Sequence, residues 1–140
     1  CGEMRLVYAN MALIGAEAFE GADAPTVTSM NFVMDSGAVG HLDTTYISPD
    51  WNNEIEIICP DYKVFVRHDQ LRIVEKEQTV TYPISHGSMM KKQDRTFYDA
   101  VLSGDCSAIR SDYFDAVKTL EATLAANRSW ETGQPVTLPM

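Results

Sequence analysis

The sequence predicts an α+β fold: an open-faced, largely antiparallel β-sheet with helices packed on one face. Two observations carry this prediction. Segments with β-type alternation or β-branched side chains follow one another up to residue 84, and apolar residues recur at helical spacing after residue 90. Strands that come first and helices that come later favour an antiparallel sheet covered on one side. The other side of the sheet then needs water, a ligand or a partner.

Turns separate the predicted strands. The polar connection Asp35, Ser36 and Gly37 between two β-rich runs indicates a hairpin. The stretch 11–19 fits a strand or a helix equally well, so both alternatives stay open. The predicted strands are residues 6–9, 26–34, 38–47, 54–59, 63–67, 71–75 and 79–84, with a short last strand at 136–138.

Two helices follow the strands. The first covers about residues 90–102 and ends at Gly104. The second is expected to begin with Ser111 as N-cap and Asp112 in its first turn, and to end near residues 127–129. Four large apolar residues form one stripe along it, which we expect to face the core: Tyr113, Val117, Leu120 and Leu124.

The composition limits the partners and the compartment. The 140 residues are the size of one domain, and 11 Lys and Arg against 20 Asp and Glu give a formal net charge of -9. Such a chain repels phosphate backbones and anionic lipids, so we expect neither nucleic acid nor membrane as partner. Three irregularly spaced cysteines (Cys1, Cys59 and Cys106) favour reduced thiols. Because no signal peptide pattern opens the chain either, we expect a cytoplasmic location.

No catalytic motif stands in the sequence. It contains no strand–GxGxxG–helix unit, no GxSxG, no CxxC and no HExxH. We therefore predict no catalytic, cofactor-binding or metal-binding residue in this chain. Because the chain starts at Cys1 without an initiator Met, we also expect it to be a piece of a larger protein.

The three histidines give weaker signals. His41 and Asp43 lie two residues apart on a predicted strand, so they share a face, either as a metal or acid–base pair or as an ordinary exposed polar pair. His68 and Asp69 fit a solvated turn. His86 lies in the connection between the strands and the helices, where a loop side chain can contact a ligand.

The loop 46–53 is the best candidate for binding. Tyr46, Trp51, Asn52 and Asn53 combine aromatic faces with amide groups, a combination that suits sugars and other polyols. The alternative is that Trp51 fills the end of the core and that the asparagines only shape a turn.

An ordered set of segments resembles a known family. These are SGAVGHLDTTYI at 36–47, NNEIEIICPDYKVFV at 52–66, TFYDAVLSG at 96–104 and RSDYFDAVKTLEATLAANRSWETGQPVTL at 110–138. Together they resemble the C-terminal domain of the glucose–fructose oxidoreductase, inositol dehydrogenase and rhizopine-catabolism family (Gfo/Idh/MocA). One departure is clear: Cys59, Pro60, Asp61 and Tyr62 replace the family's Gly-Thr-x-Gly, so that hairpin must turn differently. The family's nucleotide-binding domain, its Glu-Lys-Pro motif and its Asp-xxx-His pair have no counterpart in these 140 residues.

The resemblance implies a role. Members use NAD or NADP to oxidise or reduce a sugar, inositol or related polyol, and their N-terminal domain holds the cofactor. Residues 1–140 would be the single substrate-binding and oligomerisation domain, with no cofactor of its own. Its partners would be the nucleotide-binding domain, the polyol, and a second copy in a homodimer or higher oligomer through the open sheet face. Tyr46, Trp51, Asn52 and Asn53 fall where such a domain approaches substrate, and His86 is added from its loop position.

Two other functions remain open. The chain is a free-standing dimerisation or small-ligand binding module under the first alternative. Under the second it is an independent hydrolase or lyase that uses His41, Asp43 and His86.

Overall fold

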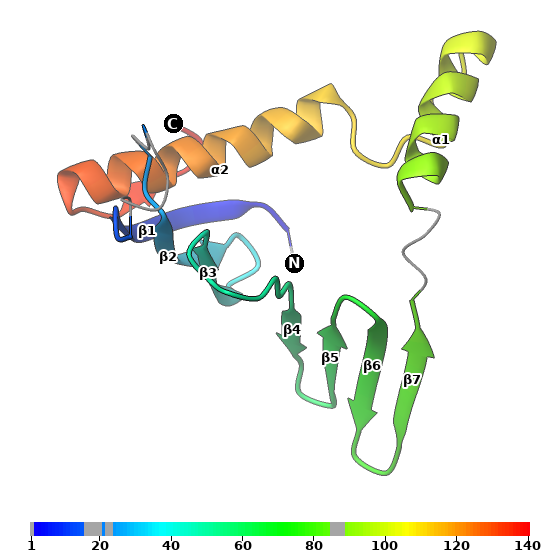
Figure 1. The fold of residues 1–140 in the computed structure, drawn as a ribbon, viewed down its shortest axis with the longest axis horizontal. Coiled ribbons are helices and arrows are strands. Elements are labelled where there is room, and N and C mark those ends of the chain that lie inside the picture. The colour runs from blue at the N-terminus through cyan, green and yellow to red at the C-terminus, as the bar shows by residue number, and fades with distance from the viewer. Residues whose placement is uncertain (1, 16–20, 22–23, 85–88) are drawn as a thin grey trace. The chain divides into compact units, whose positions relative to one another are not determined.

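The α+β prediction with open antiparallel sheets is confirmed. The computed structural model describes residues 2–15, 21, 24–84 and 89–140, which form eight strands and two helices. The strands divide into two four-stranded sheets rather than one. The chain has two compact units, Cys1–Pro49 with Ser111–Met140, and Asp50–Arg110 (Figure 1). Apart from the first strand, the predicted elements before residue 110 agree with the structure to within two residues at each end.

The first unit contains the sheet β3-β2-β1-β8. All its neighbouring strands are antiparallel. The first strand reaches residue 12, so the beginning of the ambiguous stretch 11–19 is a strand. The predicted hairpin is present, and Gly37 occupies its turn with φ of 86°. The strand bounds are β1 (Met4–Ala12), β2 (Val27–Met34), β3 (Val39–Thr45) and β8 (Val136–Thr137).

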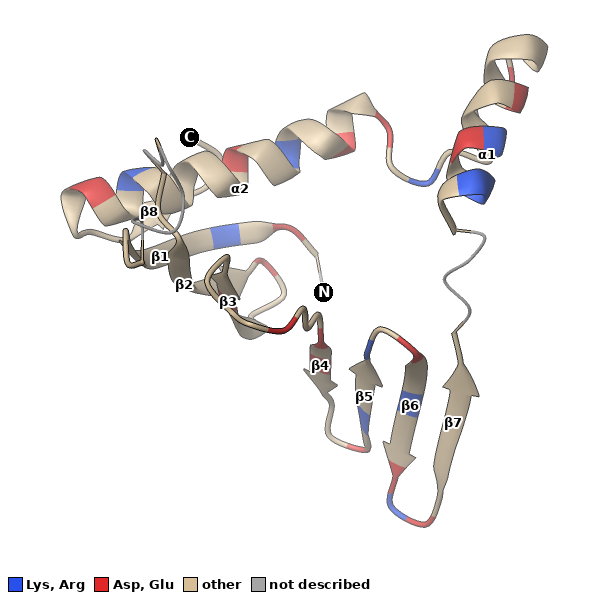
Figure 2. Ribbon diagram, in the orientation of Figure 1, with Lys and Arg blue, Asp and Glu red and all other residues tan. Residues whose placement is uncertain are grey.

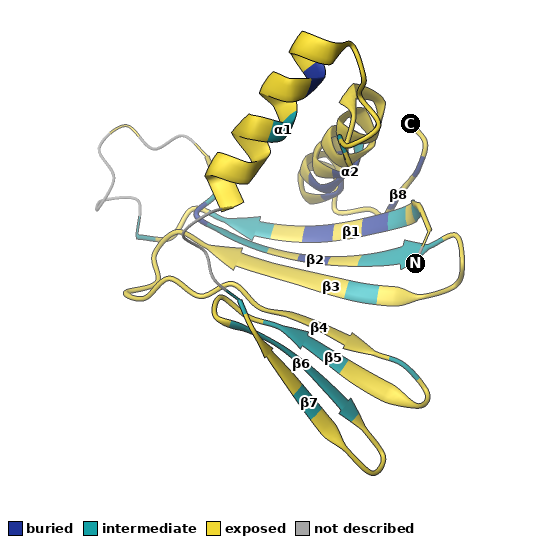
Figure 3. Cartoon of the chain, turned by 90° about the vertical axis from the view of Figure 1, so that its right-hand side faces the viewer, coloured by how far each residue is buried: buried dark blue, intermediate teal, exposed yellow. Residues whose placement is uncertain are grey.

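The core of this unit lies between β1 and α2 (Tyr113–Thr132). Figure 3 shows the buried residues gathered on these two elements. The fully buried Val7 and Ala9 of β1 belong to the same cluster as Ala125 and Ala126 of α2. Buried Ser129 accepts a hydrogen bond from the backbone N–H of Ala9 at 3.0 Å, beyond the end of β8. The helix therefore contributes both apolar contact and a partner for the strand backbone.

The expected core face of α2 is wrong. Tyr113, Val117, Leu120 and Leu124 are 79%, 45%, 56% and 47% exposed. At about 100° per residue the buried alanines lie on the opposite side of the helix from this stripe. Small side chains let a helix approach a sheet closely, and here they form the contact. Apolar periodicity identified residues that share a face, but it did not show what that face meets.

The ends of α2 are also shifted from the prediction. Asp112, not Ser111, is the N-cap, and its carboxylate accepts a hydrogen bond from the backbone N–H of Asp115 at 2.9 Å. The helix runs on to Thr132 and ends at Gly133, whose φ of 66° is left-handed.

The second unit contains a four-stranded meander and α1 (Met89–Ser103). The strands β4 (Ile55–Ile58), β5 (Tyr62–Val66), β6 (Gln70–Glu75) and β7 (Thr79–Pro83) follow in sequence order. Gly104, with φ of 72°, ends α1 as predicted. The large apolar side chains of α1 are exposed, and Ala100 is its buried residue.

The register separates the two faces of this meander. Side chains that are paired across antiparallel strands lie on the same side. One face combines charged and polar residues such as Glu56, Arg72 and Thr81 with Phe65, over whose ring the Arg72 guanidinium lies at 4.4 Å. The opposite face carries Glu75 at one end and is otherwise apolar or aromatic: Ile55, Ile57, Tyr62, Val64, Val66, Leu71, Ile73, Val80 and Tyr82.

An ion pair joins the start of β1 to α2. The Nζ atom of Lys118 lies 2.6 Å from Oε1 of Glu3. The hydrogen bond from Lys118 to Glu3 and the negative charge of Glu3 raise the pKa of Lys118 above its ordinary value of 10.5.

We expect that substituting Ala125→Leu destabilises the first unit by about 1–3 kcal/mol, because the larger side chain cannot fit between helix and sheet. Leu124→Ala is the matched control on the next residue, and it should cost less than about 1 kcal/mol because Leu124 is half exposed. Urea unfolding followed by circular dichroism measures both. If Leu124→Ala loses more unfolding free energy than Ala125→Leu, the helix orientation is contradicted.

The Lys118–Glu3 pair predicts a pH dependence. Since the pKa of Lys118 is raised in the folded chain, the pair stabilises fully below the unfolded value and is lost as pH rises through the folded pKa. We expect Glu3→Gln to bring the pKa of Lys118 back toward 10.5, measured by titrating its side-chain NMR resonances. Glu56→Gln, in the other unit, should leave that pKa unchanged. If the pKa of Lys118 is the same in Glu3→Gln as in the unmodified chain, the ion pair is absent in solution.

Candidate functional site

The predicted site residues follow β3. Tyr46 belongs to the first unit, where its backbone N–H donates to the Thr26 carbonyl at 2.9 Å and its side chain is exposed. Trp51, Asn52 and Asn53 lie ahead of β4 in the second unit and are exposed. The prediction for His86 lies outside the described residues.

Trp51 does not fill the end of the core. Its side chain is 71% exposed. The indole packs edge to face with the ring of His68, with centroids 5.3 Å apart and planes at 89°. A T-shaped contact covers at most one face of either ring, so His68 leaves at least one face of the indole free. That face is available for stacking.

Two charged residues adjoin these segments in the sequence, since Glu54 follows Asn53 and Arg67 precedes His68. Nη2 of Arg67 lies 3.0 Å from Oε1 of Glu54, where β5 ends and β4 begins. This ion pair links the segment that carries Trp51 to the segment that carries His68. We call the resulting group the Trp51 cluster: Trp51, Asn52, Asn53, Glu54, Arg67 and His68.

The Trp51 cluster offers the chemistry that recognises a polyol. The indole face suits the C–H face of a sugar, the amides donate to and accept from hydroxyls, and a carboxylate–guanidinium pair does the same. His68 lies in a turn, as predicted, but its contact with Trp51 was not predicted. The signal is the pairing of β4 with β5: continued past Ile55 and Val66, it places Glu54 opposite Arg67 and Asn53 opposite His68.

The turn that departs from the family pattern closes without glycine. The backbone N–H of Cys59 donates to the Tyr62 carbonyl at 2.9 Å. A side-chain hydrogen bond with Cys59 raises the pKa of Tyr62, and the electrostatic influence of Cys59 and of Asp61 acts in the same direction. The phenol therefore stays neutral at physiological pH and provides no phenolate base.

His41 and Asp43 share the open face of the first sheet, as predicted. Nε2 of His41 lies 3.9 Å from Oδ2 of Asp43, and both side chains are exposed. The register places Asn31 opposite His41 and Ser29 opposite Asp43. Among the described residues no three His, Cys, Asp or Glu side chains come together as a metal site. This face is mixed, because the same register also places Leu6, Val33 and Val39 on it.

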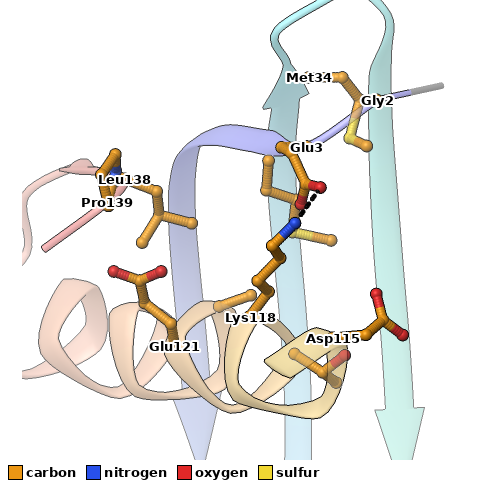
Figure 4. A pocket seen from close by; sticks show the side chains of 11 residues that line it. Gly2, Glu3, Met34, Asp115, Lys118, Glu121, Leu138 and Pro139 are labelled. Carbon is orange, nitrogen blue, oxygen red and sulfur yellow. Dashed lines mark hydrogen bonds and ion pairs between the residues drawn. The ribbon is translucent and has the colours of Figure 1, made fainter. Parts of the chain in front are cut away.

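A hollow of about 400 Å³ lies in the first unit, between the start of β1, α2 and the C-terminal residues (Figure 4). Its charged side chains already have protein partners. Lys118 pairs with Glu3, Asp115 accepts from Ser111 at 2.6 Å, and Glu121 accepts from the Met140 backbone N–H at 2.6 Å. No local sequence pattern indicates this hollow, because four segments that are distant in the sequence line it.

Charge is mixed over the described elements. Figure 2 shows acidic and basic residues interspersed on α1 and α2. No helix in the described ranges has the length and the apolar character needed to cross a membrane.

Comparison with known proteins reveals a shared fold. No protein-family model and no curated protein sequence matches the chain. Solved structures do. Levoglucosan dehydrogenase in complex with NADH and levoglucosan matches with a TM-score of 0.82 and 16% identity, over 99% of this chain and 45% of that one. Aldose-aldose oxidoreductase from Caulobacter crescentus, complexed with glycerol, matches with a TM-score of 0.80 and 16% identity, over 98% of this chain and 42% of that one.

A third structure extends the likeness. An oxidoreductase from Agrobacterium radiobacter in complex with NAD+, L-tartaric acid and magnesium matches with a TM-score of 0.75 and 14% identity, over 96% of this chain and 43% of that one. All three are oxidoreductases, as the sequence resemblance implies. The chain therefore has the fold of one part of these enzymes, and it spans less than half of their length.

Proposed function

We propose that the chain is the C-terminal domain of an NAD- or NADP-dependent oxidoreductase that acts on a sugar, inositol or related polyol. One observation carries the proposal. Nearly the whole chain, 96–99%, matches oxidoreductase structures that are more than twice as long. The sequence has no Gly-rich phosphate loop between a strand and a helix. We therefore assign the cofactor to a separate nucleotide-binding domain, and no residue of this chain to hydride transfer.

The proposed contribution of the chain to the substrate site is the Trp51 cluster. A polyol would stack on the free face of Trp51, and its hydroxyls would pair with Asn52 and Asn53. Tyr46 is exposed and also stays a substrate-binding candidate, as does His86 from the sequence alone. In these roles the residues bind and orient the substrate.

The second proposed contribution is self-association. The open face of the first sheet mixes polar and apolar residues and stays a candidate for contact with a second copy, but the face of β4–β7 is more continuously apolar and is the better candidate. On it Ile55 and Tyr82 are more than half exposed. Contiguous apolar faces of this kind mark interaction surfaces. The same face favours the alternative function, a dimerisation or small-ligand module without activity.

An activity assay on the product of the complete gene tests the proposal. We expect reduction of NAD+ or NADP+ with at least one member of a panel of sugars, inositols and other polyols. A complete gene product that binds neither nucleotide contradicts an oxidoreductase and leaves the alternative module.

Trp51→Ala in the complete protein should raise KM for the polyol about 2- to 10-fold, because one stacking contact is lost. Trp51→Phe should restore most of the affinity, and the Kd for the nucleotide should not change. Trp130→Ala on α2 is the matched control, since that side chain is also partly exposed. Unchanged KM in Trp51→Ala removes the cluster from the substrate site.

Ile57→Asp should weaken self-association of the 140-residue chain by at least about tenfold, because a charge enters the apolar face. Thr81→Asp introduces the same charge on the opposite face and should have little effect. Sedimentation velocity measures both. If the two variants act alike, or if the unmodified chain is a monomer at high concentration, this face is not the dimer contact.

A further inference from the structure

His41 and Asp43 form a pair of potential metal ligands that the proposed function does not use. The two residues lie two apart on β3, so both side chains project from the open face of the first sheet. Nε2 of His41 and Oδ2 of Asp43 are 3.9 Å apart. That separation is too long for a hydrogen bond, so neither atom satisfies the other. Both atoms can therefore accept a third group.

Asp43 has no lysine or arginine beside it on these strands. Neither β2 nor β3 contains Lys or Arg. Within the described part of the chain, the imidazole of His41 is the group that lies at ion-pair distance from the Asp43 carboxylate. A carboxylate without a permanent cation next to it is open to a cation from solution.

The separation of the two atoms fits one metal ion bound to both. Zinc binds an imidazole nitrogen at about 2.0–2.1 Å and a carboxylate oxygen at about 2.0–2.2 Å. These two bond lengths together exceed 3.9 Å, so an ion between the atoms can reach both of them. A tetrahedral angle at the ion needs a separation of roughly 3.4 Å, which a small rotation of either exposed side chain supplies.

The neighbouring strand offers a third donor. Asn31 of β2 lies directly opposite His41 in the register. Side chains paired in this way share a face, with Cβ atoms about 4.5–5.5 Å apart, so the amide oxygen of Asn31 can reach an ion held by His41. Imidazole nitrogen with oxygen donors suits zinc and similar divalent ions. Since one of the three donors is a neutral amide, the site would bind more weakly than a structural zinc site.

We propose that His41, Asp43 and Asn31 form a site for a divalent transition-metal ion of the zinc type, with water in the remaining positions. All three residues belong to the first unit, so the site needs no group from the second. The formal net charge of -9 favours the approach of cations. The site is independent of the proposed function, because it takes no part in binding the nucleotide or the polyol.

A zinc titration of the 140-residue chain, followed by the NMR resonances of the histidine rings, tests the site. The thiols are first blocked with iodoacetamide, because cysteine thiolates also bind zinc. We expect the ring resonances of His41 to shift and to saturate with a Kd below about 1 mM. The ring of His68 in the second unit is the internal control and should need at least about tenfold more zinc.

Substitutions identify the ligands. Asp43→Asn should weaken zinc binding at His41 at least about tenfold, since even the loss of a residue that only supports a metal ligand costs about 10- to 100-fold. Asn31→Ala should weaken it by a smaller factor. Asp69→Asn, next to the other histidine, is the matched control and should leave the His41 titration unchanged. Because the substituted side chains are exposed, all variants should keep the Tm of the unmodified chain.

Two results would overturn the metal site. The first is an equal response of His41 and His68 to zinc, and the second is a His41 titration that Asp43→Asn does not change. Either result would show that zinc binds only as it does to any single surface histidine. If Asp43→Asn does not fold, Asp43→Ser takes its place. Full zinc affinity in Asn31→Ala would contradict the assignment of Asn31 as a ligand.

Discussion

The close contact between the small-residue side of α2 and β1 is the constraint on which the first unit depends. Ala125 and Ala126 allow the helix to lie near Val7 and Ala9, and Ser129 comes near enough to accept the Ala9 backbone N–H. A larger side chain at these helix positions would hold the two layers apart. The backbone N–H of Ala9 would then lose its partner Ser129, at a cost of about 1–3 kcal/mol. Apolar packing and the hydrogen bond thus require the same short distance between α2 and β1.

This constraint also determines which surfaces remain free. A helix that packs on a sheet buries only one of its sides, and in α2 the buried side consists of alanines and a serine. The large apolar residues are thereby directed outward. In the second unit, the register gathers most apolar side chains on one face of β4–β7, whereas the open face of the first sheet mixes polar and apolar side chains. Each unit thus has apolar surface that its own packing does not cover, and the open face of the first sheet is mixed.

The sequence was sufficient to predict the elements and their order. Strand alternation in segments such as 54–59 and helical spacing near Gly104 are local signals, and the structure agrees with both. The orientation of α2 was not predictable in the same way, because Leu120 and Ala126 are both apolar and only the distance to the sheet decides between them. The contact of Trp51 with His68 depends on pairing across a hairpin. The division into two sheets depends on which strands meet, and composition does not encode that choice.

The most direct test of this account is the set of methyl–methyl nuclear Overhauser contacts of Val7 in the 140-residue chain. The account predicts contacts from the Val7 methyl groups to those of Ala125 or Ala126, and none to Leu120 or Leu124. Contacts from Val7 to Leu120 or Leu124 would show that α2 presents its large residues to the sheet. The outward stripe of large apolar residues on α2 would then not exist.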